Sequence, residues 1–371
     1  MISNPTDRRF KVHFHWPLLW TTLGLSAIGL VNLYSATLVL GQTGRPPLFM
    51  SQLVSIGIGF FCLFAVLVVD YRIFERVGYF LYLLSLVLLV LVIPFGKTVS
   101  GNRSWLDLGS FSFQPSEIAK LGFIFALSKF FSRAPKPEGH NFGSLGIPFL
   151  LCAIPLALIL MEKDLGSSLF FVLIFASFTL FAGARKKTIL ILLVIGLVGA
   201  GVGYAKILSP HQKARISTFL HPASDPKGKG YHLIQSKVTV GSGKIFGKGY
   251  LRGMHNKLAY LPDKHTDFIF PVLAEEWGFL GSTVVFSLYF MMIFFALGVA
   301  AKAKERFGVC LGFGIAALLF WQVAINLGGV LGLIPLTGVT LPLLSYGGSS
   351  VITILIGIGL LLNISMRRFM F

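Results

Sequence analysis

The residues of this sequence best suited to chemistry are acidic side chains at the edges of long apolar segments. The 371-residue chain has 14 Asp and Glu against 32 Lys and Arg. A charge in the core of a bilayer costs several kcal/mol unless it is paired or faces a polar cavity, so each such residue is informative. A carboxylate there can act as a general base, and a cation can stabilise an anionic leaving group. Three segments carry such groups: residues 113–120, 162–168 and 265–276.

The first segment reads Phe-Gln-Pro-Ser-Glu-Ile-Ala-Lys and ends at Lys120. Pro115 suits the first turn of a helix, where its missing N–H is not needed. Glu117 and Lys120 are three residues apart, so they share a helix face and can pair. We predict that the pair lines an outward polar cavity near Asp267. An inert structural ion pair at the membrane edge is the alternative.

The second segment, Glu162-Lys-Asp164-Leu-Gly-Ser-Ser, joins two apolar stretches. Pro155 precedes it by about two helical turns and is predicted to kink the helix. Asp164 and the amides after it would then face outward, towards the longest loop of the chain. Spacing alone leaves a solvated loop as a nearly equal alternative.

The third segment, His265-Thr-Asp267-Phe-Ile-Phe, stands where a polar run becomes apolar, and Glu275-Glu276 follows it. Partial desolvation at this depth raises the pKa of a carboxyl group, which suits a base. Asp267 could equally cap the next helix, and spacing leaves the two readings even. A lone His-x-Asp is weak evidence for a metal. The other histidines of this region, His211, His221, His232 and His255, show no ligand spacing.

The elements that must position these groups are membrane-spanning helices. Hydrophobic residues make up 55% of the chain and charged residues 12%, where soluble domains have about 25% charged. The apolar blocks are long enough to cross a bilayer, which takes roughly 20 residues of helix. We predict a single all-α polytopic domain over residues 1–371, with ten spans at 17–40, 48–69, 77–95, 114–131, 144–161, 166–184, 188–208, 278–301, 307–333 and 345–366.

The placement of basic residues sets the orientation. Ten spans put six short segments on one side, and these carry sixteen Lys and Arg, including Arg8, Arg9, Arg367 and Arg368. The opposite short loops carry four: Arg45, Lys97, Arg103 and Lys163. Because positive charge stays in the cytoplasm, both termini are predicted there. The net charge of +18 is then a topology signal and an attraction to anionic lipid, with no nucleic-acid role.

The long outer loop, residues 209–266, is predicted to be ordered. Residues 213–220 and 230–240 place apolar side chains at roughly helical spacing, which suits helices in the membrane interface. Glycines at 241, 243, 247, 249 and 253 then make a turn-rich stretch. Gly247-Lys-Gly lacks the Ser or Thr of a nucleotide-phosphate loop, so no nucleotide is expected. The three cysteines sit singly in apolar stretches and are expected to be bland buried thiols.

Six motifs together resemble the SEDS family (shape, elongation, division and sporulation), and the likeness covers essentially the whole chain. Ala274 and Gly247-Lys-Gly249 make it more similar to the RodA-type elongation branch than to the FtsW-type division branch. One departure is Arg103-Ser-Trp105, where many members have Arg directly before Trp. The motifs are 113–120, Lys163-Asp-Leu-Gly166, Gly230-Tyr-His-Leu-Ile-Gln-Ser236, His265-Thr-Asp-Phe-Ile-Phe270, Ala274-Glu-Glu276 and Pro342-Leu-Leu-Ser-Tyr-Gly-Gly-Ser349.

The resemblance implies a peptidoglycan glycosyltransferase of the bacterial cytoplasmic membrane that polymerises lipid II at the outer face. It implies a class B penicillin-binding protein as partner and matches the catalytic Asp of the family to Asp267. A divalent cation (Mg²⁺ or Mn²⁺), Lys120 or loop basic residues would balance the lipid diphosphate. The residues expected in the substrate cavity are Arg103, Glu117, Lys120, Asp164, Lys237, Lys248, His265 and Ser345.

Two other functions fit a polytopic bundle with buried charges. A lipid II flippase would show such charges, although the sequence shows no inverted repeat and a flippase needs no base at the outer surface. A scaffold without catalytic activity for the crosslinking partner would make Asp267 dispensable. The glycosyltransferase reading explains the most residues.

Overall fold

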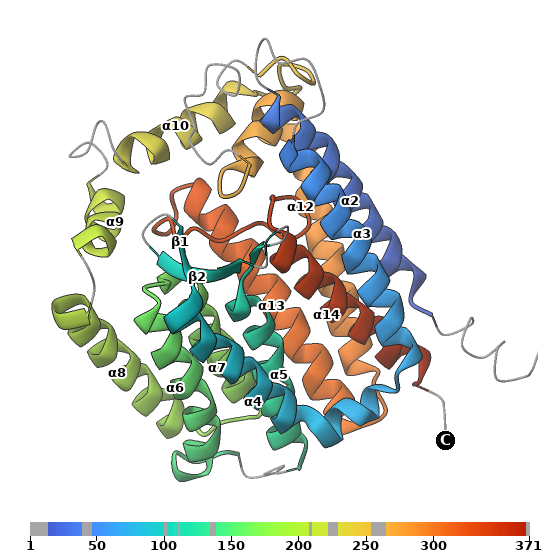
Figure 1. The fold of residues 1–371 in the computed structure, drawn as a ribbon, viewed down its shortest axis with the longest axis vertical. Helices are drawn as coiled ribbons and strands as arrows, with labels where there is room; N and C mark the ends of the chain where they lie inside the picture. Colours follow the sequence, from blue (N-terminus) through green and yellow to red (C-terminus); the bar gives the residue numbers. More distant parts are fainter. Residues whose placement is uncertain are drawn as a thin grey trace, which may run out of the picture.

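Ten long helices follow the predicted spans in the computed structural model (Figure 1). The model describes residues 14–38, 47–99, 102–107, 109, 112–133, 139–207, 210–221, 229–253 and 265–368. Arg8, Arg9, Arg45 and His255 lie outside these ranges. The helices are α2 (Trp16–Thr37), α3 (Pro47–Val68), α4 (Tyr71–Phe95), α5 (Pro115–Arg133), α6 (Gly146–Met161), α7 (Leu165–Phe181), α8 (Lys186–Val202), α12 (Ile269–Ala301), α13 (Arg306–Val330) and α14 (Gly348–Met366).

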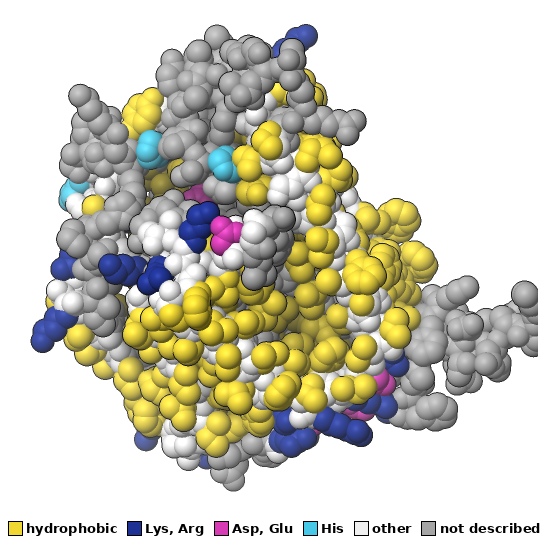
Figure 2. Space-filling model, in the orientation of Figure 1, with side chains coloured by type: hydrophobic (Ala, Val, Ile, Leu, Met, Phe, Trp, Pro, Cys, Tyr) yellow, Lys and Arg dark blue, Asp and Glu magenta, His cyan; other side chains and the backbone are white. Residues whose placement is uncertain are grey.

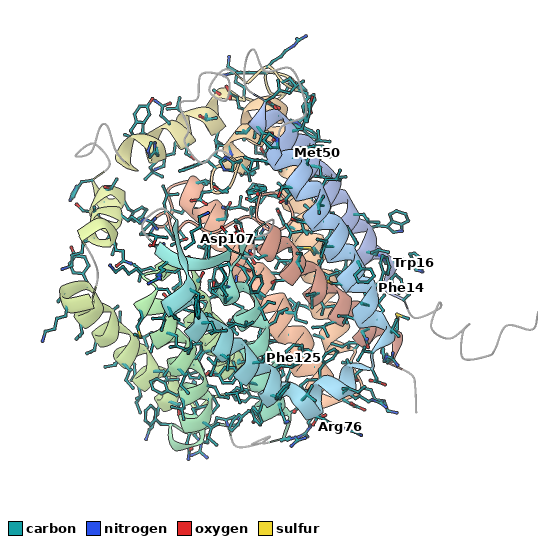
Figure 3. The ribbon with its side chains drawn as sticks, in the orientation of Figure 1. Phe14, Trp16, Met50, Arg76, Asp107 and Phe125 are labelled. Carbon is teal, nitrogen blue, oxygen red and sulfur yellow. The ribbon has the colours of Figure 1, made fainter. Side chains whose placement is uncertain are left out.

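Eight of the described helices, with flanking turns, are long and apolar enough to cross a membrane. The remaining two of the ten are α7, which is apolar but has 17 residues, and α5, which carries Glu117, Lys120 and Lys129. Apolar side chains form a broad band over the visible face, with Lys and Arg at its lower edge (Figure 2). Figure 3 places Arg76 at that edge and Asp107 beyond the band, towards the other end. This is the surface of a multi-pass membrane protein.

The core of the bundle is built around α13 and α14. In the most apolar 18-residue window of each helix, 72% of the residues in α13 and 78% of those in α14 are buried inside the protein. At the other extreme, α8 stands at the edge of the bundle with 6% of its window buried (Figure 1). Close approach of segments depends on small residues: a Cβ on Gly29 of α2 would lie 2.2 Å from the Leu343 carbonyl oxygen. The helices that surround α13 therefore hold the loop before α14 tightly.

Two helices start earlier than predicted. The third begins at Tyr71, because Asp70 caps it by accepting a hydrogen bond from the Arg72 amide at 3.0 Å. The eighth, α12, begins at Ile269 and bends at Gly278, whose φ of 67° and ψ of −163° suit glycine. The segment 269–277, which lies between the predicted loop and the predicted span, is therefore helical. The helix α6 continues through Pro155.

A small antiparallel sheet that was not predicted accompanies the helical bundle. Its strands are β1 (Lys97–Val99), β2 (Asn102–Asp107) and β3 (Ser112–Phe113), in the order β1-β2-β3. They connect α4 to α5. Strands of two to six residues carry too few side chains for a readable alternation, so the sequence pattern did not show them.

The long loop before α12 contains the two predicted amphipathic helices. They are α9 (Pro210–Leu220) and α10 (Lys229–Ser242), and a π-helical turn η2 (Gly203–Ile207) precedes α9. The glycine-rich stretch after α10 docks on α12, where the Lys248 and Gly249 amides bond the carbonyl oxygens of Glu275 and Glu276 at 2.9 Å. A short 3₁₀ turn, η1 (Gly143–Leu145), leads into α6. The described part of the loop is thus folded against the bundle.

Candidate active site

Asp267 lies half-buried in the turn that leads into α12. It lines a pocket with Ile325, Asn326, Gly329, Val330, Leu336, Thr337, Gly338 and Val339. One carboxylate oxygen, Oδ2, lies 3.6 Å from where a Cβ on Gly338 would stand. The N-cap of α12 is Phe268, without a side-chain capping bond, so the helix-cap reading of Asp267 is wrong. The position of Asp267 in the pocket is compatible with the role of a general base.

Hydrogen bonds to backbone carbonyls fix the turn that carries Asp267. The Asn326 side-chain amide donates to the Asp267 carbonyl oxygen at 3.2 Å and to that of Val339 at 2.6 Å. The Ser345 hydroxyl donates to the Thr266 carbonyl oxygen at 2.6 Å, and the Tyr346 amide donates to that of His265 at 2.8 Å. A base held in this way needs little reorganisation before it acts. These contacts give Ser345 and His265 positioning roles and leave their predicted substrate contacts without support.

Two further amides hold the loop before α14, which forms the other wall of the pocket. Gln52 donates to the Ser345 carbonyl oxygen at 3.0 Å and accepts from the Gly347 amide at 3.1 Å. Gln322 donates to the Thr340 carbonyl oxygen at 3.3 Å. With Asn326, these are residues that the sequence reasoning missed. The signal was present, because amide side chains inside apolar spans are costly unless they bond something.

Asp164 is buried and caps α7, so the solvated-loop alternative is wrong. Its carboxylate accepts hydrogen bonds from the Ser167 amide and hydroxyl at 3.0 and 2.8 Å and from Gln114 at 3.0 Å. Gly166 follows it and packs against the Asp267 pocket: a Cβ there would lie 2.6 Å from the Thr337 carbonyl oxygen. The start of α7 thus reaches the pocket wall.

Glu117 and Lys120 form the predicted ion pair, with 2.9 Å between Lys120 Nζ and a Glu117 carboxylate oxygen. Lys120 is 1% exposed and Glu117 6%. The ammonium also lies 4.4 Å from the centre of the Phe170 ring. The Asp267 pocket is lined by neither residue. The pairing is confirmed, but the pair is packed among helices, and its predicted place in a cavity near Asp267 has no support.

The predicted cations differ in how far they are engaged. Arg103 donates to the Pro94 and Gly96 carbonyl oxygens, both at 2.8 Å, and so ties β2 to the end of α4. Lys248 pairs with Glu275 at 2.6 Å and fastens the glycine-rich stretch to α12. Lys237 is exposed on α10, with its side chain beside Gly332. Arg103 and Lys248 therefore have structural partners, and their predicted substrate contacts lack support.

Two residues of α9 that the sequence reasoning missed reach the same region. Gln212 donates to the Lys163 carbonyl oxygen at 2.9 Å, and Arg215 donates to that of Thr337 at 3.4 Å. One turn of α9 thus bridges the α6–α7 turn and the pocket wall. Among the described residues, no group of three or more His, Cys, Asp or Glu side chains could hold a metal ion.

Glu162, at the end of α6, is a second buried acid beside Asp164. It is 3% exposed, and neither carboxylate oxygen has a hydrogen-bond partner within the described ranges. Burial, and to a lesser extent the neighbouring charge of Asp164, raises the pKa of Glu162 to about 8. The side chain is therefore mostly neutral at pH 7.

We expect Glu162→Gln to stabilise the protein at alkaline pH. The folded state keeps this proton up to about pH 8, whereas an ordinary Glu releases it near pH 4.5, so stability falls as the pH rises through this window. Thermal unfolding of the purified protein should show a Tm a few degrees above wild type at pH 8.5 and equal to it at pH 5. The exposed Asp107→Asn should show no such difference. An equal Tm for Glu162→Gln and wild type at both pH values would mean that Glu162 ionises normally.

Comparisons with known proteins match nearly the whole chain. Residues 16–369 match the family model of the FtsW, RodA and SpoVE cell cycle proteins. The chain is 36% identical to the peptidoglycan glycosyltransferase MrdB of Escherichia coli K12, over 99% of this chain and 98% of MrdB. It is 39% identical to stage V sporulation protein E of Bacillus subtilis, over 94% of this chain and 96% of that protein.

Solved structures agree in fold. A chain from a peptidoglycan synthase complex that coordinates polymerisation and crosslinking superposes with a TM-score of 0.81 and 32% identity, over 96% of this chain and 99% of that one. The crystal structure of the rod shape determining protein RodA of Thermus thermophilus gives 0.72 and 29%, over 96% and 98%.

Proposed function

The chain belongs to the FtsW, RodA and SpoVE family and is, like its named relatives, a peptidoglycan glycosyltransferase, and from this premise we propose that Asp267 is its general base. The substrate is lipid II, a disaccharide-pentapeptide on undecaprenyl diphosphate, polymerised at the outer face of the cytoplasmic membrane during cell elongation. The observation that carries the proposal is the Asp267 carboxylate in a pocket whose walls are held by Asn326 and Ser345.

The reaction needs one general base for the attacking hydroxyl and one positive charge to balance the leaving diphosphate. The 4-hydroxyl of the acceptor GlcNAc attacks C1 of the donor MurNAc, and Asp267 accepts its proton. The leaving lipid diphosphate is already a good leaving group, so a second carboxylic acid of the glycosidase kind is unnecessary. A single displacement inverts the configuration at C1. We also propose a divalent cation at the diphosphate, because Mg²⁺ is often held by one or two carboxylates together with the phosphates of the substrate.

Purified full-length protein incubated with labelled lipid II tests the function directly. Glycan strands on a gel, in the presence of penicillin to block crosslinking, are the expected product. A protein that moves lipid II across vesicles without making strands would be a flippase. A protein that does neither, yet activates a crosslinking enzyme, would be a scaffold.

We also propose a class B penicillin-binding protein as partner. The support is the fold match to a chain from a complex that coordinates polymerisation and crosslinking. Crosslinked product from the two proteins together, and from neither alone, is the expected result.

We propose that the loop 209–266 faces outward and both termini face the cytoplasm, from the sixteen-to-four charge split. In a variant whose native cysteines are replaced, a membrane-impermeant thiol reagent should label a cysteine at the exposed Lys244 in intact cells. A cysteine at Ser224, which lies outside the described residues, should behave alike. A cysteine at the exposed Lys304 should react only after the membrane is opened. The reverse pattern would invert the orientation.

A further inference from the structure

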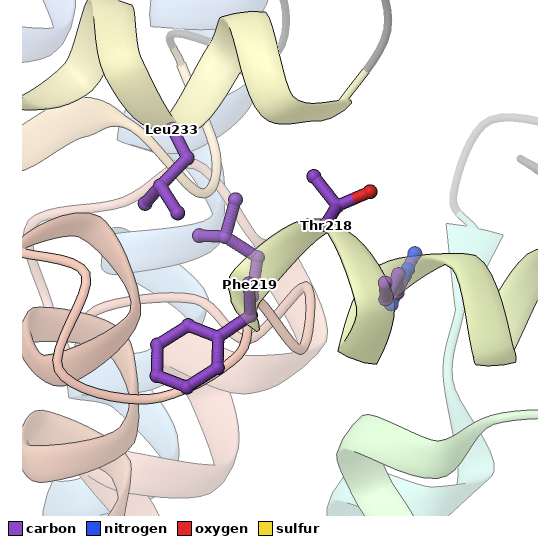
Figure 4. A pocket seen from close by; sticks show the side chains of 5 residues that line it. Thr218, Phe219 and Leu233 are labelled. Atoms are coloured by element: carbon purple, nitrogen blue, oxygen red, sulfur yellow. The ribbon is translucent and has the colours of Figure 1, made fainter. Parts of the chain in front are cut away.

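A second pocket adjoins the one that contains Asp267. Its lining residues come from three segments: Arg215, Thr218 and Phe219 from α9, Leu233 from α10, and Leu336 from the loop before α14. Leu336 also lines the Asp267 pocket, so the two share a wall. Figure 4 shows Leu233 of α10 on the side facing the turn of α9 that carries Thr218 and Phe219. We call this hollow the α9–α10 pocket.

Arg215 is the charged residue of the α9–α10 pocket, and it points to the same place as Asp267. A Cβ on Gly338 would lie 3.9 Å from an Arg215 guanidinium nitrogen and 3.6 Å from Asp267 Oδ2. A guanidinium has five N–H donors. Within the described residues, Arg215 makes one long hydrogen bond, 3.4 Å to the Thr337 carbonyl oxygen, so most of its donors are available to an anion.

Two of the other predicted cations, Lys120 and Lys248, are less available. Lys120 is paired with Glu117, and Lys248 is paired with Glu275. An anion bound beside the Asp267 pocket would therefore meet Arg215 before either of these. Planar guanidinium groups also suit phosphate oxygens, which they contact with two N–H groups at once.

The rest of the α9–α10 pocket is apolar. Phe219, Leu233 and Leu336 line it beside the methyl-bearing Thr218, and Leu233 is buried. The hollow encloses little space and opens at the protein surface, so it takes only one end of a ligand. A single cation above apolar walls fits an anionic group that continues into a hydrocarbon chain.

Resting on the proposed function, we propose that the α9–α10 pocket binds the diphosphate and first prenyl carbons of the donor lipid, with Arg215 on the phosphate. As the bond from the acceptor oxygen to C1 forms, that oxygen loses its proton to Asp267. The bond from C1 to the phosphate oxygen breaks, and its electron pair leaves on the prenyl diphosphate, where Arg215 meets the added negative charge.

The spacing of the two groups selects the donor over the acceptor. A base lies about 3 Å from the hydroxyl it deprotonates, and that hydroxyl lies about 3 Å from the carbon it attacks. The donor diphosphate is attached to that same carbon. The acceptor diphosphate is a whole disaccharide away from its reacting hydroxyl, so a cation flanking the same point as Asp267 serves the donor.

Binding of radiolabelled undecaprenyl diphosphate to the purified full-length protein tests the subsite. Arg215→Gln should weaken binding about 10- to 100-fold, as expected for a hydrogen bond to a charged group. It should leave binding of undecaprenol, which has no diphosphate, unchanged. Lys244→Gln is the matched control, because it removes an exposed cation that lines neither pocket. It should bind within about twofold of wild type, well below the loss of one such bond.

Two further variants make the outcome decisive. Arg215→Lys, which keeps the charge without the planar fork, should bind with intermediate affinity and serves if Arg215→Gln unfolds. Asp267→Asn should bind undecaprenyl diphosphate like wild type while failing to polymerise. Wild-type binding by both Arg215 variants would overturn the subsite and leave the proposed base intact. Lost binding in Arg215→Gln together with full polymerisation by Asp267→Asn would overturn the base and leave the subsite intact.

Discussion

Replacing Asp267 by Asn is expected to lower glycan polymerisation by about 10²–10⁴-fold, the usual contribution of positioned acid–base catalysis. The amide is nearly isosteric with the carboxylate but accepts no proton. The contacts from Asn326 and Ser345 reach backbone atoms of this turn, and the substitution leaves them in place. The variant should therefore fold, insert and bind lipid II. The measurement is strand formation from labelled lipid II with penicillin present.

Two matched variants separate loss of the base from loss of charge. Asp107→Asn removes an exposed carboxylate from β2 and should polymerise like wild type. Asp267→Glu keeps the carboxylate but moves it by roughly an ångström, and such a displacement alone can cost about 10²-fold in rate. Wild-type rates from a well-folded Asp267→Asn protein would refute the base assignment.

Replacing Lys120 by Met should destabilise the protein by roughly 3–5 kcal/mol, because it leaves the buried Glu117 without its partner. The cost is high here because Lys120 is 1% exposed and bonds Glu117 at 2.9 Å, so water does not compensate the carboxylate. A large fall in the Tm of the purified protein, and a parallel fall in activity, are expected. Lys304→Met, which removes an exposed cation between α12 and α13, should change neither.

The double variant Glu117→Gln with Lys120→Met isolates the cause. Removing the second charge should restore part of the Tm, because the uncompensated carboxylate is gone. A stable and fully active Lys120→Met protein would show that the pair is peripheral to both folding and catalysis. A double variant no more stable than Lys120→Met would assign the loss to packing around Phe170.

The helical spans could be predicted because apolar length alone marks them, and the Glu117–Lys120 pair because its spacing is local. The position of Asp267 could be predicted from the change from polar to apolar residues around it. Its base role rested on the family resemblance, since the local pattern also allowed a helix cap. The structure separates the two readings, because the N-cap of α12 is Phe268 and the Asp267 carboxylate lies beside Gly338 in the pocket wall.

The contacts that complete the site were not predictable because they join distant segments. Gln52 bonds Ser345 across 293 residues of sequence, and Arg215 meets Thr337 across 122. No local period encodes such pairs. For Arg103 we predicted a substrate contact because it is a basic residue in a predicted outer loop. Its guanidinium instead ties β2 to the end of α4.

The weak packing of α8 links the site to bilayer thickness. With 6% of its apolar window buried, α8 is held by lipid more than by neighbouring helices, so its tilt follows the hydrophobic thickness around it. The turn η2 continues α8, and its Tyr204 and Ala205 contact Lys213 of α9. Gln212 and Arg215 lie on that same helix. We therefore expect the lipid chain length of the membrane to act on α9, and through α9 on the wall of the Asp267 pocket.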